Sequence, residues 1–300
     1  MKVLITGATG LIGSKLTKLC IDNGWTVNYL TTRKHKLVNK ANYKGFYWNP
    51  YTGAIDKTCL DGVEVIFHLA GASVSKRWTK SYKHEILNSR IQTTSLLYNT
   101  IKKGDYNIRQ IISASGVNVY PSSLTNYYDE NFPESNPNFL GHVVEQWEET
   151  VDAFSFLNID VTKLRIGLVL SQKGGAFPKM LQPIKLGLGA PFGSGKQWQS
   201  WIHIDDLVAM FVYVSTRQIK GVVNAVAPNP VTNKELTKAI AKQVGKPLWL
   251  PNVPKFIMRL VLGEMHELLF ESQRVCSKKI ESLGFDYEFY NLKGALEDLT

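Results

Sequence analysis

The chain has 300 residues, of which 44% are hydrophobic and 20% are charged. This composition is typical of a globular protein and excludes a disordered, collagen-like or coiled-coil chain. The length allows one large α/β unit, or a core domain with a smaller second one. The 35 Lys and Arg residues outnumber the 25 Asp and Glu residues, a formal charge of +10. Such a charge favours an acidic partner, such as a phosphorylated ligand or a nucleic acid.

Neither a membrane span nor an export signal is visible in the sequence. The most apolar stretch, residues 253–270, is interrupted by charged residues that include Lys255, Arg259 and Glu264, and the chain enters an apolar strand directly after Met1 and Lys2. The cysteines are odd in number and widely spaced, which fits neither a disulfide framework nor a zinc site. We therefore expect a cytoplasmic protein with no membrane partner and with reduced thiols at Cys20, Cys59 and Cys276.

Strand-like and helix-like stretches alternate through the first two thirds of the chain. Strands are predicted over residues 2–6, 25–30, 63–70, 109–115, 160–171 and, later, 221–228. Helices are predicted over residues 11–22, 78–103 and 139–156. This alternation is typical of βαβ units and predicts an α/β fold with a doubly wound parallel sheet of the Rossmann type.

The last third has a different pattern and indicates a second, smaller domain. Residues 171–200 read as helix and loop, a helix starts at Asp205 and Asp206, and another starts near Thr232. We predict a Rossmann domain over residues 1–170, to which 201–228 return. Residues 171–200 and 229–300 would form the smaller substrate domain.

A glycine-rich turn lies between the first strand and the first helix. In GATGLIG, Gly7 allows a tight turn, Gly10 lets a pyrophosphate approach the backbone, and Gly13 lets the helix pack closely on the strand. The alternative is a purely structural turn. The position after a strand and before a helix favours a dinucleotide site, with contacts expected from Gly7, Thr9, Gly10, Leu11, Ile12 and Gly13.

The end of the second strand indicates which dinucleotide binds. NAD enzymes carry Asp or Glu there to hold the ribose 2′-hydroxyl, whereas this chain has Thr32 and Arg33. A guanidinium suits a 2′-phosphate, so NADP(H) is the predicted cofactor. The lysines that follow, Lys36, Lys40 and Lys44, are expected to be surface charges.

Together with this turn, HLAGA (68–72) and SASGVNVY (113–120) resemble an extended short-chain dehydrogenase/reductase. The later blocks are similar to those of the atypical, epimerase-like branch of that superfamily: RIGLVLSQKGGAFPKML, GLGAPFGSGKQWQSWIHIDDL, GVVNAVAPNPVTNKEL and SLGFDYEFYNLKGALEDL. The resemblance covers essentially the whole chain. It implies a Rossmann core, a smaller C-terminal substrate domain, bound NADP(H) and a nominal nucleoside-diphosphate-sugar epimerase activity.

The resemblance also assigns individual positions. Leu69, Ala70 and Gly71 match the segment that lies along the cofactor, and Glu85 and Arg90 match positions that contact NADP. A surface ion pair between these last two residues is the alternative. Val169 matches a position that contacts the nicotinamide, and packing in the protein core is the alternative.

The catalytic pair of the superfamily is missing. Its hydride-transferring members use a Tyr with a Lys four residues later, but Phe139 and Val143 occupy those places. The Tyr98 to Lys102 spacing is interpreted as a chance match on the wrong helix. The residues best placed by motif are Tyr120, as the proton-transferring phenol, and Ser115, as its expected hydrogen-bond partner. His142 is a further candidate base by residue type.

The substrate is not identified by sequence. Nucleotide-sugar epimerases carry an Arg four residues before the histidine of the later helix start, and Gln199 stands there in this chain. A neutral amide disfavours a UDP-sugar unless Lys196 substitutes. His203 and Asp205 are expected to anchor the helix start.

Two functions stay open. One is an NADP(H)-dependent epimerase or oxidoreductase acting on a small polar substrate, sugar-derived or not. The other is a non-catalytic NADP(H) sensor or interaction protein. The six histidines are scattered, so no metal site is predicted, and no nucleic-acid partner is expected. The chain would be a monomer or a homodimer.

Overall fold

A computed structural model describes all residues from 1 to 300. Its main sheet contains β1 Lys2–Thr6, β2 Thr26–Thr31, β3 Asn39–Lys40, β4 Tyr43–Asn49, β5 Ala54–Ile55, β6 Val65–His68, β7 Gln110–Gly116, β8 Asp160–Ile166 and β12 Gly221–Ala225. The strand order is β12-β8-β7-β6-β1-β2-β4-β3, with β5 paired to β4. All neighbours are parallel except the pairs that β4 makes with β3 and β5. The predicted parallel α/β fold is confirmed.

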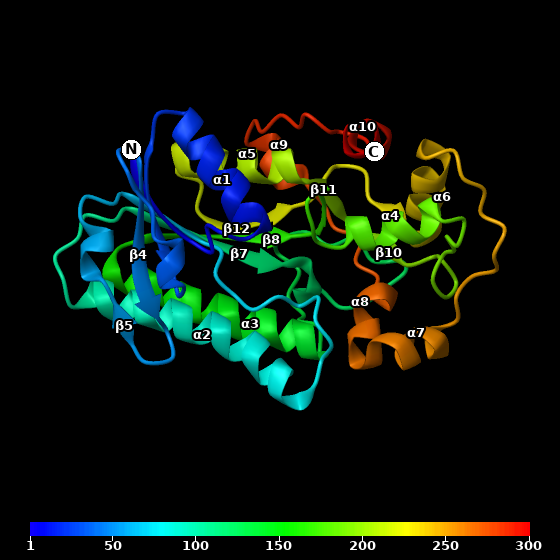
Figure 1. The fold of residues 1–300 in the computed structure, drawn as a ribbon, viewed down its shortest axis with the longest axis horizontal. Helices are drawn as coiled ribbons and strands as arrows, with labels where there is room; N and C mark the ends of the chain where they lie inside the picture. Colours follow the sequence, from blue (N-terminus) through cyan, green and yellow to red (C-terminus); the bar gives the residue numbers. More distant parts are fainter.

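Helices cover both faces of this sheet (Figure 1). One face carries α1, Leu11–Asp22, and α5, Ile204–Thr216; the other carries α2, Lys80–Lys102, and α3, Phe139–Asp152. Each layer has its own apolar core, because the strands alternate their side chains between the two faces. The two cores fix where the carboxyl ends of the strands lie.

The direction of the chain reverses at β1. From β1 the chain moves outward to β2 and β4, then crosses back to β6 on the other side of β1. Ligands of open α/β sheets bind at such a reversal, outside the carboxyl ends of the strands. Thr6, His68 and Ser115 lie at this edge.

Most helices of the C-terminal part lie at one end of the sheet, whereas the helix Lys278–Ser282 packs on the core of the main sheet (Figure 1). A distinct apolar core joins α4, α6 and α10. The short strands β10 Trp198–Gln199 and β13 Val231–Thr232 pair antiparallel. The helices of this part are α4 Phe177–Lys185, α6 Asn233–Gln243, α7 Lys255–Leu262, α8 Glu267–Phe270, α9 Lys278–Ser282 and α10 Leu292–Leu299.

The strand predicted over residues 160–171 is in fact two strands. After β8, the chain leaves the main sheet at Gly167, and β9, Leu168–Leu170, pairs in parallel with β11, Trp201–His203. A Cβ at Gly167 would lie 2.2 Å from the carbonyl oxygen of Ser200, so only glycine permits this crossing. The apolar run is continuous in sequence, which hides the break.

The strand β4 was not predicted. It holds Lys44, which is exposed as expected of surface charge, within an alternation of buried and exposed residues that includes buried Phe46 and Trp48. The tight contact of the Tyr29 ring with Gly45 requires a residue without a side chain there. Aromatic residues at alternate positions were the available signal.

Both outer edges of the main sheet are partly covered. On one side, β4 is covered by the two-residue strands β3 and β5, and its Gly45 N–H and Tyr47 carbonyl also bond to the Val38 carbonyl and the Asp56 N–H. On the other side, Lys279 Nζ donates to the Val222 carbonyl of β12 (2.5 Å), and the Asn224 N–H donates to Glu130 Oε1 (2.8 Å). Both edges are therefore interrupted by contacts from elsewhere in the chain.

No helix combines the length and the apolar character needed to cross a bilayer.

Candidate functional site

The glycine turn lies at the point where the strand order reverses. Gly7 has φ +71°, and a Cβ there would lie 2.8 Å from the Leu69 carbonyl oxygen. A Cβ at Gly13 would lie 2.2 Å from the Gly7 carbonyl oxygen, so the helix can approach the turn only without a side chain. Gly10 differs: it is exposed and caps α1 in extended conformation.

The start of α1 is suited to an anion. The first turn contains no acidic residue, and no side chain caps the helix, so the backbone N–H groups of Leu11 and Ile12 have no capping partner. The Gly10 N–H donates to the Gly7 carbonyl (2.9 Å) and closes the turn. Helix N-termini of this kind bind phosphate groups through those N–H groups and the helix dipole. The exposed Gly10 leaves room for a ligand at the backbone.

The segment after β6 lies beside this turn. The N–H groups of Leu69 and Ala70 both donate to Thr6 Oγ1, at 3.0 Å each. Gly71 packs against the Arg90 side chain, whose guanidinium would be 3.2 Å from a Cβ at position 71. These contacts bring the residues 69–71 and Arg90 to the carboxyl edge of the sheet.

Arg90 is fixed in place by the backbone and by an aromatic ring. Its Nη1 donates to the carbonyls of Ile86 (2.8 Å) and Ala72 (3.2 Å), and the guanidinium lies 4.9 Å from the centre of the Trp147 ring. Burial lowers the pKa of Arg90 to about 10, so the side chain keeps its positive charge near neutral pH. The ion pair with Glu85 is not formed. Glu85 instead accepts a hydrogen bond of 2.5 Å from the Tyr51 hydroxyl.

Thr32 and Arg33 follow β2 directly and are exposed. Arg33 precedes a short 3-10 turn, Lys34–Lys36, and no carboxylate lies within ion-pair distance of its guanidinium. Lys34 lies over the ring of Tyr47, 5.1 Å from its centre. The end of β2 therefore offers cations and no acid to a ligand.

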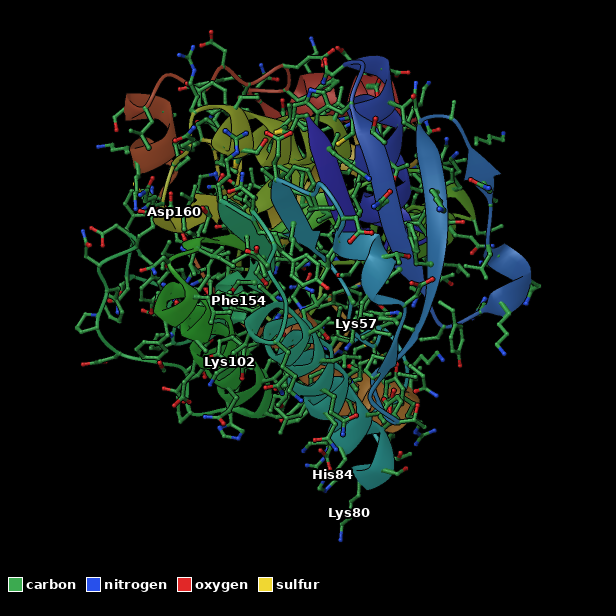
Figure 2. The ribbon with its side chains drawn as sticks, turned by 90° about the vertical axis from the view of Figure 1, so that its left-hand side faces the viewer. Lys57, Lys80, His84, Lys102, Phe154 and Asp160 are labelled. Carbon is green, nitrogen blue, oxygen red and sulfur yellow. The ribbon has the colours of Figure 1, made fainter.

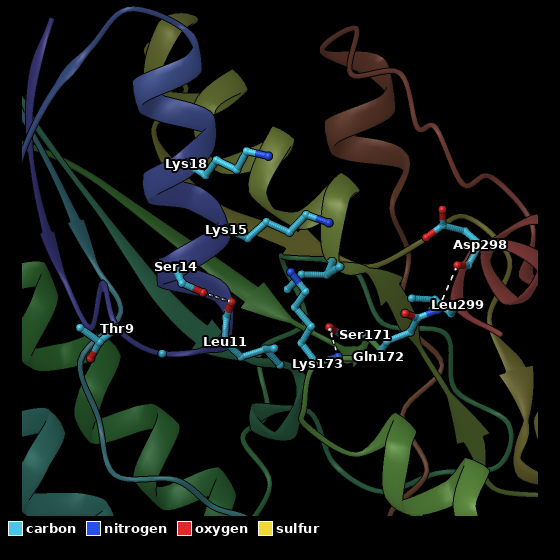
Figure 3. A pocket seen from close by; sticks show the side chains of 12 residues that line it. Thr9, Leu11, Ser14, Lys15, Lys18, Ser171, Gln172, Lys173, Asp298 and Leu299 are labelled. Carbon is cyan, nitrogen blue, oxygen red and sulfur yellow. Dashed lines mark hydrogen bonds between the residues drawn. The ribbon is translucent and has the colours of Figure 1, made fainter. Parts of the chain in front are cut away.

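A cavity of about 620 Å³ opens beside the start of α1 (Figure 3). Lys15 and Lys18 reach toward it from α1, and Lys173 reaches toward it from the loop after β9. The same loop contacts the glycine turn, because a Cβ at Gly175 would lie 3.3 Å from the Leu11 side chain. The cavity is lined by Thr9, Gly10, Leu11, Ser14, Lys15, Lys18, Ser171, Gln172, Lys173, Ile204, Asp298 and Leu299.

The structure brings together a group that sequence spacing did not show. Donor atoms of His203, Asp205 and Asp298 lie within 4.8 Å of one another. The Asp205 N–H donates to His203 Nδ1 (3.2 Å), so the ring proton is on Nε2, which faces the Asp298 carboxylate at 3.2 Å. Lys15 forms an ion pair with Asp205. His203 caps the start of α5 as expected, whereas its buried Nε2 makes no hydrogen bond.

Ser115 belongs to a buried charged network. Its hydroxyl donates to Glu148 Oε1 at 2.5 Å, and Arg165 binds both oxygens of Glu148 at 2.9 Å. Burial raises the pKa of Glu148, but the hydrogen bonds and charge of Arg165 outweigh it, so the net shift is downward and Glu148 is a carboxylate. Because the Ser115 hydroxyl donates its hydrogen bond to Glu148, it cannot donate one to a substrate in this arrangement.

Tyr120 is the second member of this network. Its hydroxyl donates to Asn224 Oδ1 (2.8 Å) and accepts from Arg165 Nη1 (3.0 Å). The expectation of a hydrogen bond between Ser115 and Tyr120 was wrong, because Arg165 and Glu148 lie between them. Burial raises the pKa of Tyr120 to about 12, against the lowering effect of Arg165. Its side chain is 1% exposed and stacks on Tyr128.

The Tyr98 and Lys102 spacing lies away from the carboxyl edge. The Lys102 ammonium lies over the Tyr98 ring, which packs edge-on against Phe154. In Figure 2, Lys102 and Phe154 lie toward the end of the sheet where Asp160 starts β8, and Lys80 and His84 lie at the opposite end of α2. The two residues form a local packing contact.

The positions of the missing pair are apolar contacts. Phe139 packs edge-on against Trp78, and Val143 is buried in the same cluster. His142, on the other side of α3, is exposed. Val169 is half-buried in β9 and packs against the core between the sheet and α5, with Gly175 close to its carbonyl oxygen.

Sequence reasoning missed Glu148, Arg165 and Asn224. Arg165 stands near the end of β8, whose centre is buried, and Glu148 follows Trp147 on a helix face that is mostly buried. A charge at such a position needs a partner, which was the available signal. Which residue would be that partner depends on pairing across the sheet, and periodicity does not show it.

Comparisons with known proteins agree with this geometry. The sequence profile of the NAD dependent epimerase/dehydratase family matches residues 3–226, and that of a domain of unknown function, DUF1731, matches residues 253–299. Epimerase family protein SSP1921 of Staphylococcus saprophyticus is 36% identical over 304 residues, covering 99% of this chain and 98% of that protein.

Two solved structures illustrate the fold. The human epimerase family protein SDR39U1, crystallised with NADPH, has a TM-score of 0.85 and 29% identity, covering 100% of this chain and 99% of that one. MoeE5 in complex with UDP-glucuronic acid and NAD has a TM-score of 0.79 at 19% identity, covering 100% and 97%, a likeness of fold. With a reversal-point glycine turn, a parallel sheet and these matches along its whole length, the chain belongs to the NAD-dependent epimerase/dehydratase family.

Proposed function

We propose that this protein binds NADP(H) across the carboxyl edge of its sheet and acts on a small polar substrate between the two parts of the chain. The observation that carries the proposal is the uncapped start of α1 behind Gly10, beside the segment 69–71. The pyrophosphate would bind the N–H groups of that helix start. The nicotinamide would extend toward Val169 and the adenosine toward Thr32.

The choice of NADP(H) over NAD(H) rests on charge at the end of β2. Arg33 is exposed and has no acidic partner, so its guanidinium is free to bind a 2′-phosphate. NADPH is bound by human SDR39U1, whereas NAD is bound by MoeE5. This chain has no acid at the end of β2 to hold a ribose 2′-hydroxyl, which favours NADP(H) over NAD(H).

Titration of both reduced cofactors tests this assignment. Arg33→Asp should weaken NADPH binding by about 1.5–3 kcal/mol, the scale of a hydrogen bond to a charged group, and leave NADH binding equal or stronger. Lys36→Asp is the matched control, since it makes the same charge change within the same loop. Equal affinity of the wild-type protein for NADPH and NADH would refute the assignment.

A UDP-sugar is not the substrate that we favour. Gln199 lies in β10, paired with Val231 of β13, and offers an amide where nucleotide-sugar epimerases carry a guanidinium. A smaller polar molecule, sugar-derived or not, needs no diphosphate clamp. The three buried free thiols agree with the reducing cytoplasm that we propose as its location.

A second candidate function is NADP(H) sensing without turnover. It is favoured by the engagement of the Ser115 proton with Glu148 and by the buried phenol of Tyr120. Enzyme loaded with NADPH deuterated at C4 and incubated with fractionated metabolites would separate the two. Deuterium transfer to a product, or solvent-proton exchange into one, supports catalysis; retention of all deuterium supports the sensor.

A further inference from the structure

The C-terminal part exposes large apolar side chains at one end of the molecule. The exposed fractions are 68% for Trp249, 65% for Phe256, 77% for Leu260 and 63% for Val261, and Ile257 is also exposed. We call these five residues the α7 face. They lie within 13 residues of sequence, in the most apolar stretch of the chain, and the proposed cofactor site uses none of them.

One face of α7 is apolar and exposed. None of its eight residues is buried, and its apolar side chains at 256, 257, 260 and 261 share that face. The opposite side carries Met258 and Leu262, which are half-buried, and the chain turns at Gly263 with φ +61°. A water-exposed face of this kind is unfavourable unless something covers it.

The surroundings of the α7 face are strongly basic. From Lys234 to Leu262 the chain carries six cations and a single acid, so this segment supplies five of the ten net positive charges. The acid, Glu235, is engaged in a capping box with Thr232. Glu264 and Glu267 follow directly after α7, and Glu264 is paired with Lys83. Figure 1 shows α6, the connection and α7 along the same end of the molecule. The cations are Lys234, Lys238, Lys242, Lys246, Lys255 and Arg259.

Charge and chemistry select the occupant. A second copy seated face to face would place these cations against one another, which opposes association. A nucleic acid would satisfy the cations but leave Leu260 and Val261 in water. An anionic lipid surface satisfies both, because the helix can lie in the interface with apolar side chains among acyl chains, cations at the phosphates and a tryptophan at the boundary.

We propose that the α7 face binds the surface of an anionic phospholipid bilayer. With a length of about 12 Å, α7 is far too short to span the bilayer and would lie parallel to it. The contact is peripheral and reversible, and it leaves the carboxyl edge of the main sheet free. It departs from our sequence-based expectation of no membrane partner.

Vesicle flotation tests the proposal with the full chain. Wild-type protein should float with vesicles of phosphatidylcholine and phosphatidylglycerol, float much less with phosphatidylcholine alone, and lose binding as salt rises. The double variant Phe256→Ser, Leu260→Ser should lose binding roughly tenfold or more. Phe156→Ser is the matched control, because Phe156 is 83% exposed but lies after α3, away from this face.

NADPH affinity and melting temperature show whether the variants fold, and both should match those of the wild-type protein. No flotation of the wild-type protein with anionic vesicles would overturn the proposal. So would equal flotation of the double variant. Sedimentation velocity that shows a wild-type dimer, abolished in the double variant, together with no flotation, would assign the face to a second copy instead.

Discussion

Thr6 Oγ1 donates to His68 Nδ1 at 2.9 Å and accepts the N–H groups of Leu69 and Ala70, which joins the ends of β1 and β6. Because Nδ1 is the acceptor, the ring proton is on Nε2, which donates to Thr94 Oγ1 at 3.0 Å. Thr94 in turn donates to the Arg90 carbonyl (2.7 Å). One neutral imidazole thus links the end of β1 to the end of β6 and to α2, at the point where the strand order reverses.

This arrangement predicts a pH dependence of stability. Burial, with a smaller effect of Arg90, lowers the pKa of His68 to about 3, against about 6.5 in the unfolded chain. The unfolded state therefore binds more protons below pH 6.5, and the contribution of His68 is complete above that pH and lost as pH falls toward 3. Between pH 6.5 and 4 the loss is about 3 kcal/mol of unfolding free energy.

Urea unfolding of His68→Gln across that range measures the effect. The stability difference between wild type and variant should shrink by about that amount as pH falls to 4. His142→Gln is the control, because His142 is exposed, and its curve should run parallel to the wild type. Parallel curves for His68→Gln as well would contradict the prediction.

Gly10→Val should abolish NADP(H) binding and leave the fold in place. Gly10 is exposed, and its nearest contact for an added Cβ is the Gly7 carbonyl oxygen at 3.2 Å, so the fold tolerates a side chain that blocks the backbone from a phosphate. Gly13→Ala should instead lower the melting temperature, because its Cβ would overlap that oxygen at 2.2 Å. Calorimetry and NADPH titration separate the effects; unchanged binding in Gly10→Val means that the turn is structural.

Tyr120→Phe separates a structural from a catalytic phenol. The change leaves Asn224 Oδ1 and Arg165 Nη1 without a partner in a buried region, so unfolding free energy should fall by about 1–3 kcal/mol. With a pKa raised to about 12, proton transfer by the phenol would grow only at strongly alkaline pH. Loss of turnover in a variant that still melts near the wild type would establish the catalytic role. Tyr98→Phe should retain turnover.

Glu148→Gln should destabilise the protein more than any surface change. The carboxylate compensates the buried Arg165 and lies 3.7 Å from Lys163, so its loss leaves positive charge in a buried site at a cost of about 3–5 kcal/mol. Asp152→Asn is the milder comparison, because that carboxylate is half exposed and binds Lys163 alone. Equal melting temperatures of the two variants would show that the network contributes little.

The sequence was informative where local rules act. The glycine turn needs three glycines at fixed places, and the structure shows the physical cause at Gly7 and Gly13. The capping box at Thr232 and Glu235 was likewise visible as a helix start. Such features depend on residues within one or two turns of one another, so spacing alone predicts them.

Contacts between distant segments escaped prediction. Ser115 and Glu148 are 33 residues apart, and Tyr120 and Asn224 are 104 apart, so their pairing depends on strand order. The departure of β9 at Gly167 depends on the Ser200 carbonyl, which no local pattern reveals. The chemistry at the centre of the site is built from these distant pairs, and this is why its acid and base could not be assigned from sequence.

The partly covered edges of the sheet limit how two copies of this chain could associate. A strand from a second copy needs a free row of N–H and C=O groups, and β4 and β12 already bond to Val38, Asp56, Lys279 and Glu130. These bonds, and the short strands β3 and β5, oppose a dimer with one continuous sheet. Growth into fibres by strand addition would first require the loss of these edge contacts.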